Sequence, residues 1–245
     1  MSSDNTSLVS ALPDVQFVTG FPEGIVAFTT MRRAGSFGFG SLETVASVSD
    51  RWSALQDGLN TLGVARLASA TQVHGAVVAR HDAGWNGWLR MRGVDGHVTN
   101  VPGTALAITV ADCTPIFIAH PAGAIAALHA GWRGTDARIF DVGLDLLSAM
   151  GYPADECVIH LGPAICKSCY EVGPEVLSAV HAKLHTRKGQ LDVRAVLTEQ
   201  ANERRVSSIT TSTWCTRCDH EHFFSHRAGD DGRQLGVIVI PGESS

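Results

Sequence analysis

The chain has 245 residues, of which 44% are apolar and 18% are charged, and its formal net charge is −5. This composition suits a globular protein with a sizeable core, and the negative charge argues against nucleic acid or an anionic membrane as a partner. No apolar run approaches the roughly 18 residues of a membrane span, and no signal peptide is recognisable, so we expect a cytoplasmic protein whose six cysteines are thiols or metal ligands rather than disulfides.

The predicted elements mix strands and helices, and no shift in composition marks a boundary between domains. We therefore expect a flexible polar tail at 1–14 and a single mixed α/β domain at 15–245. The elements are, in chain order, strands at 15–18 and 24–30, a basic glycine-rich loop at 31–40, a helix at 41–62 capped by Ser41, strands at 67–73 and 77–80, a polar insertion with two tryptophans at 81–92, strands at 93–99, 104–110, 116–119 and 124–128, a helix at 135–150, a strand at 157–161, helices at 173–185 and 191–203, and a strand at 235–240.

The middle of the chain carries the polar groups best suited to chemistry. Apolar runs typical of buried strands end in Cys113 and in a segment that contains His129 and Arg133. Thr135 or Asp136 could cap a helix after the glycine turn, so that backbone N–H groups beside Arg133 would face an anion. A thiol, an imidazole and a guanidinium on rigid backbone meet what a functional site requires.

Three side chains beside predicted strands form the first candidate site: His74, Cys113 and His129. Two imidazoles and a thiolate suit Zn²⁺, and a fourth position left open would make the site catalytic rather than structural. The alternative is a metal-free nucleophile–base pair of Cys113 and His129. In that case Asp112 or another carboxylate would orient the imidazole, and the reaction would be acyl or amide hydrolysis.

Four other cysteines form two Cys-x-x-Cys pairs, which are the usual signature of a structural zinc site; they are Cys166, Cys169, Cys215 and Cys218. The interval between the pairs is longer than in common zinc ribbons, so buried thiols without a metal are the competing interpretation. Several catalytic motifs are absent from the sequence, namely the cytidine-deaminase zinc signature, Gly-x-Gly-x-x-Gly, the Walker loop and Gly-x-Ser-x-Gly.

Five segments of the chain resemble the YfiH family, also called the laccase-domain family; they are 71–75 (Thr-Gln-Val-His-Gly), 95–117, 127–135, 161–173 and 223–233. Members of that family are described both as polyphenol oxidases and as purine nucleoside phosphorylases. The resemblance implies a layered α/β/β/α sandwich. It also matches His74, Cys113 and His129 to the metal ligands of the family.

The resemblance implies phosphorolysis of purine nucleosides (adenosine, inosine, guanosine and methylthioadenosine) and hydrolytic deamination of adenosine, with Zn²⁺ as the cofactor. Arg133 would join the three ligands as a catalytic residue and hold phosphate together with Arg32 or Arg33. Arg227 lies in another segment that would contact substrate. The expected partners are small molecules, with no nucleic acid and no membrane, and the protein is expected to be a monomer or a homodimer.

Two other functions stay open within the resemblance. A polyphenol oxidase would bind Cu²⁺ through the same ligands, but multicopper laccases carry several His-x-His pairs and this chain has only His220-Glu221-His222. Peptidoglycan-precursor editing is a further role proposed in the family, and its distant likeness to Cys–His deamidating toxins is compatible with the hydrolase. The chain departs from the family at Glu43, where asparagine is usual, and at Ala228, where arginine is usual, so its substrate range could differ.

Overall fold

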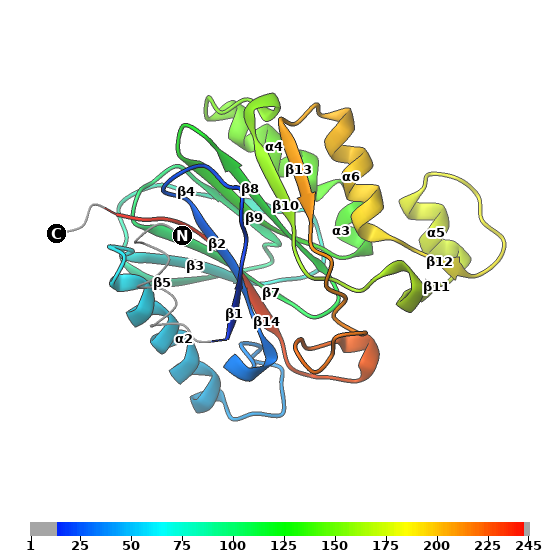
Figure 1. Cartoon of the computed structure of the whole chain (residues 1–245), viewed down its shortest axis with the longest axis horizontal. Coiled ribbons are helices and arrows are strands. Elements are labelled where there is room, and N and C mark those ends of the chain that lie inside the picture. The colour runs from blue at the N-terminus through cyan, green and yellow to red at the C-terminus, as the bar shows by residue number, and fades with distance from the viewer. Residues whose placement is uncertain (1–13, 243–245) are drawn as a thin grey trace.

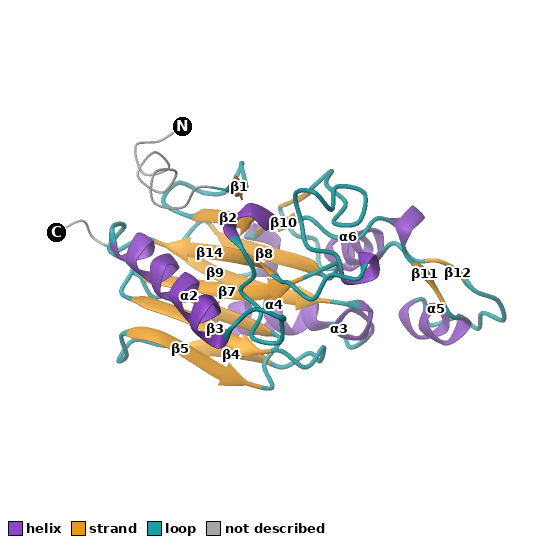
Figure 2. Cartoon of the chain, turned by 90° about the horizontal axis from the view of Figure 1, so that it is seen from below, coloured by secondary structure: helices purple, strands orange, loops and turns teal. Residues whose placement is uncertain are grey.

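Two six-stranded mixed sheets stack face to face in the computed structural model of the protein (Figures 1 and 2), which describes residues 14–242. The first sheet contains, from edge to edge, β1 (Val15–Phe17), β2 (Val26–Thr30), β14 (Gln234–Ile240), β7 (Thr104–Val110), β3 (Arg66–Thr71) and β5 (Gly87–Arg92). The second contains β13 (Ser208–Thr211), β10 (Val158–Leu161), β8 (Thr114–His120), β9 (Ala124–Ala130), β6 (Gly96–Thr99) and β4 (Val78–His81). A small ribbon of β11 (Glu171–Val172) and β12 (Gly189–Gln190) lies apart from both.

Helices cover the outer face of each sheet, and Figure 1 shows them on opposite sides of the molecule. On the first sheet, α2 (Val45–Asn60) packs through Trp52 and Leu55. On the second, α4 (Ile139–Ala149) and α6 (Val193–Glu203) pack through Leu144 and Leu197. The short helices are α3 (Trp132–Asp136), α5 (Pro174–Val180), η1 (Arg32–Ala34), η2 (Ala154–Glu156), η3 (Lys167–Cys169) and η4 (His226–Ala228). The predicted mixed α/β fold is confirmed, with its layers in the order helix, sheet, sheet, helix.

The central strands are continuous apolar runs because both of their faces are buried. In β7, Leu106 points between the sheets and Ala105 points toward α2. In β8, Phe117 lies between the sheets and Ile116 faces the helices of the second sheet. Each large apolar side chain buried in this way stabilises the fold by about 1.5–3 kcal/mol. A strand with two buried faces has no need of the polar alternation typical of a half-exposed strand.

Several local predictions are wrong. The first helix begins at Val45 rather than near residue 41, because the hydroxyl of Thr44, not Ser41, accepts the capping bond from the Ser47 N–H (3.2 Å). The polar insertion at 81–92 contains β5, an edge strand parallel to β3. Its polar alternation is weak because the exposed residues Leu89, Arg90 and Arg92 fall on both faces of this edge strand.

The helix predicted at 135–150 is two helices. Gly131, rather than Thr135 or Asp136, is the N-cap of α3, so Arg133 lies inside this short helix. The Thr135 hydroxyl donates back to the Gly131 carbonyl (2.9 Å). Arg138 then adopts a left-handed conformation (φ 56°), which separates α3 from α4.

The predicted tail at 1–14 lies outside the described residues except for Asp14, and the single domain at 15–245 stays a prediction. Within residues 14–242, no helix combines the length and the apolar character that a membrane crossing requires.

Candidate metal centre and substrate cavity

Three side chains meet where the chain passes from the first sheet to the second. His74 lies in the β3–β4 connection and Cys113 in the β7–β8 connection, and both lie at the same end of the molecule because β3 and β7 are parallel. His129 is paired in register with Pro115, near the start of β8. The ligand atoms of the three side chains all lie within 4.8 Å of one another. We call these three residues the His–Cys–His centre.

Asp95, whose role is not predicted from the sequence, holds two members of this centre in place. Its fully buried carboxylate accepts hydrogen bonds from the N–H groups of His74 (2.8 Å) and Gly75 (2.8 Å) and from Nδ1 of His129 (2.9 Å). Since Nδ1 of His129 is engaged, Nε2 is the nitrogen left for Cys113 or a cation. The one signal in the sequence is the position of Asp95 at the start of segment 95–117, which resembles the family.

Two residues of the centre's connections adopt the left-handed backbone region without being glycine. They are His74 (φ 61°) and Asp112 (φ 78°). Asp95 supports the first, and the Asp112 carboxylate supports the second by accepting from the Thr216 hydroxyl (2.6 Å) and the Arg227 N–H (2.7 Å). Such conformations cost about 1–3 kcal/mol each and concentrate at functional sites, where surrounding contacts enforce them.

The electrostatics of the centre favour a thiolate. Burial would raise the pKa of Cys113, but the charge of His129 and hydrogen bonds from His129 and His74 outweigh burial and lower the pKa to about 6. Burial would lower the pKa of His129, but the Cys113 thiolate and the hydrogen bond to Asp95 raise the pKa to about 9. A thiolate is the form of cysteine that binds a metal or attacks a substrate.

A cavity of about 590 Å³ is lined by the centre and by four arginines, which are Arg90, Arg133, Arg227 and Arg233. Its size is in the range of small-molecule sites. Two of these arginines, Arg133 and Arg227, are predicted from the sequence, and Arg90 and Arg233 are not. The missed pair lies on β5 and just before β14, and nothing in the local sequence reveals that both elements border the same cavity.

The two N-terminal arginines predicted to hold phosphate do not line this cavity. Arg32 pairs with Asp230 and donates to the Phe223 carbonyl (3.0 Å), so it fastens its loop to the C-terminal segment. Arg33 is exposed. A phosphate-binding role for either residue stays a prediction.

The four remaining predicted ligands, Cys166, Cys169, Cys215 and Cys218, also meet, with all sulfur atoms within 4.8 Å of one another. We call them the tetracysteine cluster. None of them lines the cavity.

The protein is thus a layered α/β protein. Its His₂Cys cluster lies where the chain passes from one sheet to the other, and the cluster lines a cavity. The YfiH protein of Bacillus licheniformis has the same fold, with a TM-score of 0.85 at 22% identity, over 93% of this chain and 97% of that chain. The chain belongs to the family described as multi-copper polyphenol oxidoreductase laccase, whose model matches residues 26–241.

Two relatives carry names of purine enzymes. A purine nucleoside phosphorylase of Streptomyces coelicolor is 36% identical over 190 residues, which cover 74% of this chain and 78% of that protein. Adenosine deaminase RL5, from an unknown prokaryotic organism, is 35% identical over 161 residues, or 60% of this chain and 59% of that protein. The matched region thus spans less than two thirds of the deaminase's length.

Proposed function

We propose that the protein is a Zn²⁺-dependent enzyme that cleaves purine nucleosides with phosphate and also deaminates adenosine. The observation that carries this proposal is the convergence of His74, Cys113 and His129 at an arginine-lined cavity. The names of the relatives support the same substrate class.

The donor set fits Zn²⁺. Two imidazole nitrogens and a thiolate are ligands that zinc prefers, and three protein ligands leave a tetrahedral position open. The pairing of the Asp95 carboxylate with His129 is the arrangement that orients metal-binding imidazoles. Bound Zn²⁺ would supply Lewis-acid chemistry that lowers the free-energy cost of negative charge on an attacking oxygen.

Phosphate would be held by Arg133 and Arg227, with Arg233 as a third cation lining the cavity. The Arg227 guanidinium donates to the Glu171 carbonyl (2.9 Å) and lies 5.0 Å from the Tyr170 ring centroid. Such a guanidinium is already oriented, so less conformational entropy is lost when it pairs with a phosphate oxygen.

The purine base would stack at the aromatic part of the cavity. The Phe39 ring, which lines the cavity, stacks on Trp88 (6.1 Å between centroids) and lies under the Arg90 guanidinium (4.5 Å). Trp88 in turn stacks on Trp52 (4.6 Å), so the platform is rigid. Flat aromatic faces of this kind bind purines by stacking.

The test is to incubate purified, untagged protein with inosine, with and without phosphate, and separately with adenosine. We expect hypoxanthine release that requires phosphate, conversion of adenosine to inosine, and zinc rather than copper by elemental analysis. Cys113→Ala should lose both reactions, whereas Cys157→Ala, a cysteine outside both clusters, should keep them. Phosphate-independent hypoxanthine release, or full activity in Cys113→Ala, would contradict the proposal.

A metal-free hydrolase is the second candidate, because a pKa of about 6 for Cys113 and about 9 for His129 favours a thiolate–imidazolium pair. Asp95, rather than the Asp112 considered from the sequence, would then orient the imidazole. This candidate would be favoured if metal-free protein kept its full acyl or amide hydrolase activity and lost that activity when iodoacetamide labels Cys113.

A further inference from the structure

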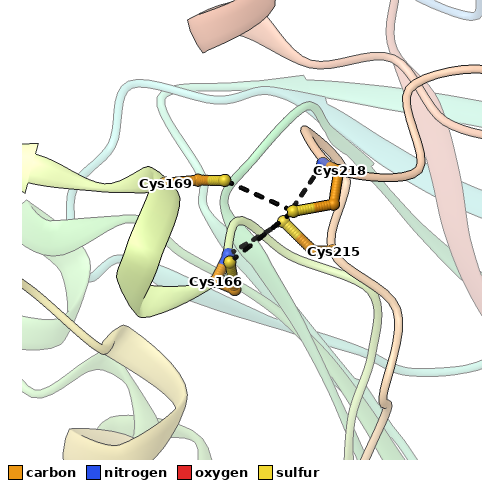
Figure 3. A group of neighbouring side chains, drawn as sticks. All are labelled: Cys166, Cys169, Cys215 and Cys218. Atoms are coloured by element: carbon orange, nitrogen blue, oxygen red, sulfur yellow. Dashed lines mark hydrogen bonds between the residues drawn. The ribbon is translucent and has the colours of Figure 1, made fainter.

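Two loops that are far apart in the sequence meet at the tetracysteine cluster (Figure 3). After β10, Cys166 precedes η3 and Cys169 is its last residue, and Cys215 and Cys218 follow β13. Because β10 and β13 are parallel neighbours, both loops leave the second sheet at the same end. The long interval between the pairs, which argued against a zinc site in the sequence, is therefore the crossover between two adjacent parallel strands.

The sulfur positions match ligands around a single cation. The Sγ atom of Cys218 lies 4.0 Å from that of Cys166 and 3.4 Å from that of Cys169. Zn–S bonds of about 2.3 Å in a tetrahedron would separate the sulfurs by about 3.8 Å. A disulfide would require about 2.05 Å, and all four cysteines are free.

The surroundings of Cys215 favour a thiolate. The N–H groups of Cys166 and Cys218 donate to Sγ of Cys215 (3.2 and 3.4 Å), and such bonds stabilise the charged form of sulfur. Four thiolates around Zn²⁺ leave a net charge of about −2. Each Cys-x-x-Cys turn contains one basic residue, Lys167 or Arg217, which offsets part of that charge.

Both loops are tied to the connection that carries Cys113. The Ile165 N–H, next to Cys166, donates to the Asp112 carbonyl (3.0 Å). The Thr216 hydroxyl, next to Cys215, donates to the Asp112 carboxylate (2.6 Å). Tyr170, next to Cys169, lies beside Arg227 in the cavity wall.

We propose that Cys166, Cys169, Cys215 and Cys218 bind one Zn²⁺ in a closed structural site. The cation fastens the two loops together and so fixes the cavity wall that carries Tyr170 and Arg227. Four sulfur ligands complete the tetrahedron, so this zinc has no open position for a substrate.

The direct test counts zinc in the double variant His74→Ala/Cys113→Ala, which removes the other centre and keeps all four cysteines. We expect one zinc per chain, and thiolate-to-cobalt charge-transfer absorption after replacement with Co²⁺. Adding Cys218→Ser should remove both signals, and adding Cys157→Ala should change neither. A folded double variant that holds no zinc, with the four cysteines reacting as free thiols or joined in disulfides, would overturn the proposal.

A second measurement addresses the role of the site in the full chain. In Cys218→Ser, the amides of Thr216 and Arg227 should exchange with solvent faster than in the wild type, because their loops are no longer fastened. The KM for phosphate should rise roughly 10-fold with little change in kcat. Of these measurements, only the KM depends on the proposed function. If the protein holds the structural zinc but does not catalyse phosphorolysis, the proposed reaction is refuted and the proposed structural site is still supported.

Discussion

The His–Cys–His centre and the tetracysteine cluster are ordered in opposite ways. The centre stands at the ends of central strands, and Asp95 holds it through backbone and imidazole hydrogen bonds before any cation arrives. The cluster lies on loops, and no buried carboxylate holds its sulfurs; within the described residues they are linked by N–H···S bonds to Cys215 and by sulfur–sulfur contacts to Cys218. The protein therefore builds the first site itself, whereas a cation would supply much of the order at the second.

Under the two proposals, the same metal would have two different uses. Three ligands next to a cavity leave a position for substrate, so rigidity must come from the protein. Four ligands away from the cavity leave no such position, and the binding free energy of the cation becomes folding free energy for the loops. Removing metal should thus leave the first site intact in shape and loosen the second.

The largest effect should come from His129→Ala. Activity should fall by roughly 10³-fold, because several kcal/mol of charge stabilisation are lost with the metal. The zinc content should fall by one equivalent per chain, while the thiolate-to-cobalt absorption of the tetracysteine cluster persists in the Co²⁺-substituted protein. His181→Ala, at an exposed histidine, is the matched control. Loss of both equivalents would show that the two sites are not independent.

Much of the fold could be predicted from the sequence, since buried strands such as β7 and β8 are continuous apolar runs between turn signals. The edge strands β5 and β13 could not, because their exposed residues fall on both faces and therefore follow no clear period. The alternating layers, with Leu106 inward and Ala105 outward, depend on the pairing of distant strands, which no local pattern contains.

The two candidate sites could be predicted to different degrees, because one depends on local spacing and the other on residues that are far apart in the sequence. Cys-x-x-Cys spacing is local, so the tetracysteine cluster could be suspected without any relative. His74 and Cys113 lie in two separate connections and His129 lies on β9, so they formed a weak candidate from the residues alone, which the family resemblance strengthened. Asp95 and Arg233 lie at the ends of segments that resemble the family, and Arg90 lies outside them, but the roles of all three depend on tertiary neighbours that the sequence does not reveal.

A smaller effect than the loss of His129 is expected for Asp95→Asn. The amide keeps the shape but has no negative charge to match the His129 ring and the backbone N–H groups of His74 and Gly75. Partners of metal ligands are worth roughly 10- to 100-fold in metal affinity or activity. Competition with a chelating dye would measure that affinity. Asp82→Asn, at an exposed carboxylate, should leave it unchanged.

Gly131→Ala should weaken only the centre. A Cβ atom there would lie 2.9 Å from Sγ of Cys113 and 3.5 Å from Cδ2 of His74, so the thiolate must move. Crowding of this kind costs about 1–3 kcal/mol, and we expect roughly a 10-fold loss of metal affinity with the tetracysteine signal retained. At Gly40 a Cβ would meet no atom within 4 Å, so Gly40→Ala is the steric control. Unchanged affinity in Gly131→Ala would mean that the sulfur has more freedom than the structure shows.

The smallest effect concerns acid stability behind the centre, where His97 is buried beside His81 (2.9 Å between Nε2 of His81 and Nδ1 of His97). Burial, together with the charge of His81, lowers the pKa of His97 to about 3, and burial also lowers the pKa of His81. The unfolded chain takes up these protons more readily than the folded chain. The contribution of the two neutral histidines to stability is therefore fully present above the ordinary histidine pKa of about 6.5, and it is lost as the pH drops below that value.

For each of these histidines, the free energy of unfolding falls by roughly 1.4 kcal/mol per pH unit between its ordinary pKa and its lowered pKa. The lowered pKa of Asp95 changes stability only below the ordinary pKa range of a carboxyl group. Asp95 therefore does not contribute to the loss of stability between pH 6.5 and pH 4.5. Urea unfolding across that window should show a shallower decline for His97→Phe than for the wild type, while His181→Gln should follow the wild type. Comparing slopes rather than absolute stabilities removes the packing cost of the substitution, and an unchanged slope would mean that the pKa of His97 is not lowered in the folded chain.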